Sequence, residues 1–119
     1  MRRGPLLAVL GVVVVFAVVG GYLVVRSQSS GGKQVTLDVT VTGASQMSPD
    51  HLTVAHNDTV TINVRSDRSG EVHLHGYDIH FETKPGEVAS QTFHADKTGD
   101  FELEWESSST HLGDLVVNP

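Results

Sequence analysis

The chain of 119 residues contains no cysteine. This absence excludes disulfide bridges, thiolate metal ligands, a cysteine nucleophile and a lipid-modified cysteine of the kind found in lipoproteins. A folded domain of about ninety residues must then be held together by its hydrophobic core alone, which is feasible for one compact unit.

Basic residues are scarce after Arg26. All 14 Asp and Glu residues follow that position, and only five Lys and Arg residues oppose them, which leaves a net charge of −9. A surface of this sign excludes a nucleic-acid partner. It favours a metal ion or a cationic partner, although an excess of acidic residues is most often just a solvated surface.

Charge is absent altogether from Leu6 to Val25. About twenty apolar residues are what a helix needs to cross the bilayer, and Pro5 suits the first turn of such a helix. The run is longer than the apolar segment of a usual signal peptide and lacks a small-residue cleavage site, so an uncleaved anchor is favoured over a cleaved one. Arg2 and Arg3 precede the run, which predicts a cytoplasmic N-terminus.

The sequence therefore predicts a single-pass anchor at residues 1–26, a Ser/Gly linker at residues 27–33 and a domain at residues 34–119. The domain is expected on the extracellular or periplasmic side of the cell membrane.

Helical periodicity is absent from residues 34–119, where polar and apolar residues alternate with the period of two that is typical of strands. Seven or eight short strands separated by turn residues predict an all-β sandwich of two antiparallel sheets. The segments expected to form strands are residues 34–43, 48–67 around a turn at 56–58, 71–84, 88–96, 101–107 and 114–119, and the segment 71–84 is expected to break or bend at Gly76 and then resume.

The segment "EVHLHGYDIH" at residues 71–80 carries three histidines. Residues two apart on a strand point the same way, so His73 and His75 share a face and can hold one metal or two adjacent ones. His111, in the loop before the last strand, is the leading candidate for a third ligand, and His80 lines the site or its rim. The alternative is a solvated strand face that is rich in histidine.

Other polar residues give weaker signals. His51 and His56 are expected at the surface, and His94 ends a strand without a clear role. Glu104 and Glu106 are expected on a solvated face, where either could ligate a hard cation. A carboxylate such as Asp78 or Glu71 is expected to hold a ring nitrogen of a ligating histidine. Trp105 is expected in the core.

Three segments in order resemble the cupredoxins: "MSPDHLTVAHNDTVTINVRSD", "EVHLHGYDIHFETKPGE" and "TGDFELEWESSSTHLGDLVVNP". The resemblance covers residues 34–119 and is strongest to small cupredoxin-like domains that carry an H-x-H-G-Y-D segment behind a membrane anchor. It implies a Greek-key β-sandwich with a metal site at one end.

The resemblance places His73 at the first histidine of the blue-copper site. The family's cysteine position falls at or near Trp105, its second histidine position falls in residues 107–109, and its methionine position falls near His111. Without a thiolate, a type-1 copper centre is excluded. The resemblance instead implies an all-nitrogen or mixed site of His73, His75 and His111, with His80, for copper or alternatively zinc or iron.

The expected role is that of a metal carrier, store or sensor with an unidentified protein partner, and not an enzyme. A metal-free sandwich that acts as a scaffold or accessory module is the main alternative. A copper–zinc superoxide dismutase also carries an H-x-H pair on a strand, but this chain lacks the length and the cysteines of that enzyme.

Overall fold

The computed structural model describes residues 13–17, 22–26 and 32–119. Its strands are β1 (Val13–Ala17), β2 (Tyr22–Arg26), β3 (Gln34–Thr42), β4 (Gln46–Ser48), β5 (His51–Ala55), β6 (Thr59–Ser66), β7 (Gly70–Leu74), β8 (Ile79–Thr83), β9 (Val88–His94), β10 (Gly99–Trp105) and β11 (Thr110–Asn118). A single 3₁₀ turn, η1 (Glu106–Ser108), joins β10 to β11. The prediction of an all-β domain is confirmed.

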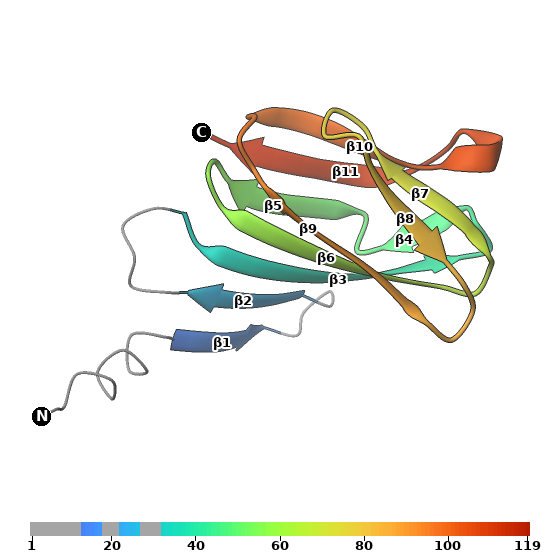
Figure 1. Ribbon diagram of the computed structural model, residues 1–119, viewed down its shortest axis with the longest axis horizontal. Coiled ribbons are helices and arrows are strands. Elements are labelled where there is room, and N and C mark those ends of the chain that lie inside the picture. Colours follow the sequence, from blue (N-terminus) through green and yellow to red (C-terminus); the bar gives the residue numbers. More distant parts are fainter. Residues whose placement is uncertain (1–12, 18–21, 27–31) are drawn as a thin grey trace, which may run out of the picture.

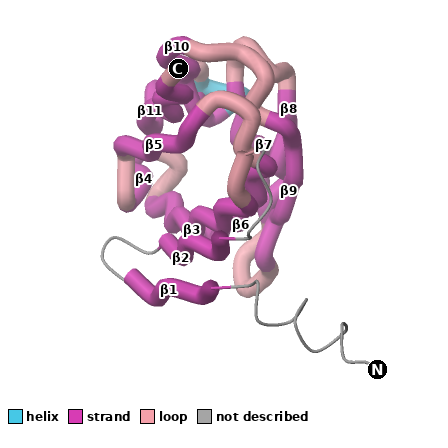
Figure 2. Tube along the Cα trace, turned by 90° about the vertical axis from the view of Figure 1, so that its left-hand side faces the viewer, coloured by secondary structure: helices cyan, strands magenta, loops and turns pink. Residues whose placement is uncertain are grey.

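The strands form two sheets that lie on opposite sides of an interior (Figures 1 and 2). One sheet, which we call sheet A, has the order β1-β2-β3-β6-β9, with β4 paired to β3. The other, sheet B, has the order β5-β11-β10-β7-β8. Both sheets are mixed, because β3 pairs with β6 and β5 pairs with β11 in parallel. The expectation of purely antiparallel sheets is therefore wrong.

The core lies between the two sheets and is built by the alternation read from the sequence. In β10, Leu103 and Trp105 are buried while Glu102 and Glu104 face outward. The largest fully buried side chains are Phe81, Leu37, Leu52, Ile62, Leu74, Leu103 and Leu115. Burying a side chain of this size contributes about 1.5–3 kcal/mol, so the interior holds the sandwich without disulfides.

Residues 13–17 and 22–26 were predicted to belong to a transmembrane helix. In the structure these two segments are the antiparallel strands β1 and β2, and β2 also pairs with β3. Both segments are rich in valine, which favours strands as well as apolar surroundings. No helix long and apolar enough to cross a membrane occurs among the described residues. The rest of the predicted helix lies outside them, so the anchor stays a prediction.

Three details of the strand assignment differ from the prediction. Residues 34–119 contain nine strands and not seven or eight, because the short strand β4 was not anticipated and residues 71–84 form two separate strands. The strand expected to break or bend at Gly76 does break there, and its two parts, β7 and β8, pair with each other as a hairpin, which was not anticipated. The last strand begins at Thr110, where residues 110–113 were expected to be loop. Hydrogen bonding between neighbouring strands, which alternation does not reveal, decides each of these boundaries.

The turn predicted at residues 56–58 is confirmed, and a second turn lies at residues 84–87. Asn57 has a φ of 74°, and the amide of Glu87 donates to the carbonyl of Lys84 across Pro85-Gly86. Buried Asp58 fixes the first of these turns, because its two carboxylate oxygens accept hydrogen bonds from the backbone of Lys33 and Ala55, each at 2.9 Å.

Candidate metal centre

The outward face of sheet B alternates histidine with carboxylate. On β7, Val72 and Leu74 point into the core, so His73 must point outward, and the chain turns out of the strand at His75. Strand register sets His73 opposite His80 on β8 and opposite Glu104 on β10. Imidazoles and carboxylates from three strands therefore meet on one face.

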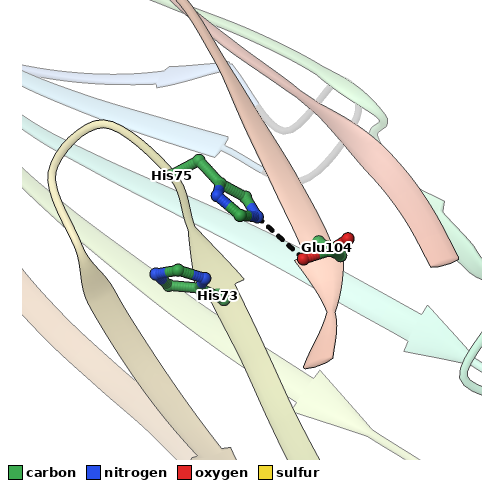
Figure 3. Close-up of side chains that lie close together, drawn as sticks. All are labelled: His73, His75 and Glu104. Atoms are coloured by element: carbon green, nitrogen blue, oxygen red, sulfur yellow. Dashed lines mark hydrogen bonds and ion pairs between the residues drawn. The ribbon is translucent and has the colours of Figure 1, made fainter. Parts of the chain in front are cut away.

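His73, His75 and Glu104 form a cluster whose three ligand atoms lie within 4.8 Å of one another (Figure 3). Nε2 of His75 lies 2.7 Å from a carboxylate oxygen of Glu104. The rings of His73 and His75 have centroids 4.2 Å apart and planes inclined by 50°. The side chains of His73 and Glu104 are only 14% and 17% exposed, so packing restricts their rotamers.

His73 also belongs to a second cluster with Asp78 and His80, whose ligand atoms likewise lie within 4.8 Å of one another. The rings of His73 and His80 are stacked at 4.3 Å. Asp78 Oδ1 lies 2.9 Å from Nε2 of His73 and 3.2 Å from Nε2 of His80. On the other side of its ring, Nδ1 of His80 lies 2.6 Å from Glu71. The prediction that Asp78 or Glu71 holds a ring nitrogen is confirmed.

The turn that links the two clusters is held by the residues after His75. The His75 amide donates to the carbonyl of Glu102, which extends the pairing of β7 with β10. Gly76 follows with a φ of +85°, and its α-carbon packs against the ring of Phe101. The hydroxyl of Tyr77 donates to the carbonyl of Lys97 at 2.7 Å and accepts from the Lys97 amide at 3.0 Å. The G-Y-D part of the motif thus fixes where the clusters lie.

These contacts shift the pKa values of His75 and Asp78. The hydrogen bond to Glu104 raises the pKa of His75. Hydrogen bonds from His73 and then His80 lower the pKa of Asp78, which stabilises its carboxylate. Because a metal binds neutral imidazole, the raised pKa of His75 means that protons compete with the metal at this residue.

His111 does not join either cluster. Its Nδ1 lies 2.9 Å from Glu102, and that contact raises the pKa of His111. Sheet order explains the difference from the prediction: β10 lies between β7 and β11, so His111 and His73 are two strands apart, about 10 Å. Glu104, on the intervening strand, takes the third position that the sequence interpretation gave to His111.

The remaining histidines lie apart from the clusters. His51 and His56 are exposed, as predicted, and His94 is exposed at the end of β9. The signal for Glu104 was present in the sequence, because the alternation of Phe101, Leu103 and Trp105 sets the glutamates between them on the outward face.

The donor set of the first cluster suits a transition metal. Two imidazole nitrogens and one carboxylate oxygen are ligands that Cu(II) and Zn(II) accept. A type-1 copper site stays excluded, because the side chain at the expected thiolate position is the buried Trp105. His73, His75 and Glu104 would thus hold the ion as a mixed nitrogen and oxygen site.

Comparison with known proteins supports the fold. No protein-family model matches the chain, and no curated protein sequence matches it either. Three solved structures that resemble it are described as a heme-copper terminal oxidase dimer, a copper binding protein in the apo form and the multicopper oxidase mgLAC.

The likeness to these structures is one of shape. Their TM-scores are 0.67, 0.62 and 0.53, with sequence identities of 17%, 18% and 18%. The matches cover 90%, 78% and 72% of this chain, and 78%, 95% and 39% of the respective structures. Identities this low establish architecture and leave function open. Together with the two-sheet topology, they show that this chain has a cupredoxin-like fold.

Proposed function

We propose that the cupredoxin-like domain binds a copper ion through His73, His75 and Glu104. The observation that carries this proposal is the convergence of two imidazoles and a carboxylate within 4.8 Å on the paired strands β7 and β10. The side chains of His73 and Glu104 are restricted by packing, and a hydrogen bond from the His75 amide to the Glu102 carbonyl fixes the backbone of His75. Such a prepared site reduces the entropy that ordering the ligands would cost.

Copper is favoured over zinc and iron for two reasons. A site of nitrogen and oxygen ligands binds Cu(II) more tightly than the other common divalent ions. The three similar structures are also described as copper or multicopper proteins. Zinc with two histidines and one glutamate is the runner-up, since that ligand set is well known for zinc.

The domain is proposed to carry, store or sense the metal and not to catalyse a reaction. Rapid electron transfer of the blue-copper kind needs a thiolate, which the chain cannot provide. A carrier needs ligands that are accessible, and the side chain of His75 is 43% exposed. The uncharged run at residues 6–25 supports a placement at the membrane, with the domain outside the cytoplasm and a protein partner in metal handling.

A metal-free scaffold or accessory role is the second candidate, and one observation favours it. Nε2 of His75 is already paired with Glu104, and Nε2 of His73 with Asp78. These nitrogen atoms therefore have hydrogen-bond partners within the protein, and they do not require a metal ion to be paired.

Metal titration of the purified full chain separates the two roles. Copper and zinc are added in steps, binding is followed by calorimetry, and the metal content is measured after dialysis. We expect this cluster to retain one equivalent of metal after dialysis. The affinity of the double variant His75→Ala/Glu104→Gln for the metal should be about 100-fold weaker than that of the wild type. His51→Ala, which removes an exposed histidine from β5, is the matched control. A folded chain that retains no metal would leave the scaffold role.

A further inference from the structure

The second cluster, His73 with Asp78 and His80, has its own access to solvent. The side chain of Asp78 is 83% exposed and that of His80 is 43% exposed. Beside His80 lies an open hollow of about 390 Å³ between β8 and β9, lined also by Glu71 and Gln91. An ion can therefore reach this cluster without passing through the first one.

The two nitrogens of the His73 ring face different neighbours. Its Nε2 lies 2.9 Å from Asp78, on the side of β8, and its Nδ1 lies 3.3 Å from Glu106, at the end of β10. In Figure 3 the two nitrogens stand at opposite edges of the ring, one of them on the side of His75 and Glu104. A neutral imidazole can bind one metal ion through each nitrogen once its single N–H proton has been lost.

Two of these rings have carboxylate oxygens near both of their nitrogens. His73 and His80 each face a carboxylate oxygen at both nitrogens, at distances between 2.6 and 3.3 Å. A neutral imidazole has a single N–H and can satisfy only one of the two. A metal ion bound at one nitrogen of such a ring would replace the missing hydrogen-bond donor there.

The geometry points to a second metal ion at His73, Asp78 and His80, with His73 as a ligand shared between the two ions. This inference rests on the proposed function, because it takes the first ion to occupy His73, His75 and Glu104. When the neutral His73 ring bridges, it gives up its single N–H proton to solvent and binds as the imidazolate anion. Asp78 changes from accepting a hydrogen bond to supplying an oxygen ligand, and no other reactant is required.

The test is a Cu(II) titration of the full chain, with equivalents counted by metal analysis and by the intensity of the EPR signal. Two bound equivalents are expected. An EPR signal that grows up to one equivalent and falls toward the second is also expected, because two Cu(II) ions joined by one imidazolate couple magnetically. His80→Ala and Asp78→Asn should each remove the second equivalent alone, and asparagine suits the left-handed backbone of residue 78. His51→Ala should bind as the wild type does.

The outcomes separate this inference from the proposed function. A single equivalent that is lost in His75→Ala and kept in His80→Ala overturns the second ion and leaves the proposed function intact. Two equivalents whose EPR intensity equals two independent ions overturn the shared ligand. No bound metal in a folded chain overturns both proposals together. Circular dichroism of each variant confirms that the sandwich is folded before its stoichiometry is counted.

Discussion

Replacement of Gly76 by alanine tests how tightly the turn after β7 is packed. A methyl group at this position would lie 2.2 Å from the ring of Phe101, far inside normal contact. The backbone there has a φ of +85°. Gly86 is a matched control, because its φ is +83° while nothing lies within 4 Å of its added methyl group. The two variants share the backbone effect and differ in the steric one.

The expected sizes follow from these two numbers. A left-handed conformation costs an L-residue about 1–2 kcal/mol, and alanine recovers about 0.4–1 kcal/mol by restricting the unfolded chain. Gly86→Ala should therefore lower the free energy of unfolding by about 1 kcal/mol. Gly76→Ala must also displace the Phe101 ring, and overpacking of this kind adds about 1–3 kcal/mol. The difference between the variants is the steric contribution.

Urea unfolding followed by the fluorescence of Trp105, which is only 4% exposed, measures both variants. The double variant Gly76→Ala/Phe101→Ala supplies a further check. Removing the ring should relieve the clash, so the two changes should be non-additive by more than about 0.5 kcal/mol. Equal free energies of unfolding for Gly76→Ala and Gly86→Ala would refute the reasoning, because the turn around residue 76 would then accommodate the methyl group without energetic cost.

Three further predictions concern individual contacts. Asp58→Ala leaves two backbone N–H groups without their carboxylate, and we expect a loss of about 2–3 kcal/mol in urea unfolding. An unchanged midpoint would mean that water replaces the carboxylate. Tyr77→Phe removes both hydrogen bonds to Lys97 and should cost about 1–2 kcal/mol and weaken metal binding; full stability would contradict the role of the hydroxyl. Glu104 raises the pKa of His75, so this contact adds stability below the usual value of 6.5 and the contribution is lost as pH rises through the raised pKa. NMR titration of the His75 ring should therefore show a lower pKa in Glu104→Gln, and an equal pKa would exclude the contact in solution.

Much of the fold could be predicted because strand alternation is a local property. Phe101, Leu103 and Trp105 alternate with glutamates, and that pattern alone places the glutamates on the outward face of β10. The turn at Asn57 follows from the tolerance of asparagine for a positive φ. His73 and His75 could be paired for the same reason, since their spacing keeps them on one side of a strand or its continuation.

The composition of the metal cluster could not be predicted because it depends on which strands are neighbours. His111 is close to Glu104 in the register of β10 and β11, yet the sheet order places a whole strand between it and His73. A bulge between Leu103 and Glu104 also shifts that register, so counting residues along β11 does not give the partner of each side chain. The parallel pairing of β3 with β6 is likewise invisible in either segment alone.

The position of β11 has a consequence for how the protein is made. It is the last strand of the described residues, and in sheet B it separates β5 from β10, which do not pair with each other. Both of its neighbours therefore have an unpaired edge until residues 110–118 have been synthesised. Such edges are sites of aggregation, so sheet B is protected from edge-to-edge association only after its last strand has joined it.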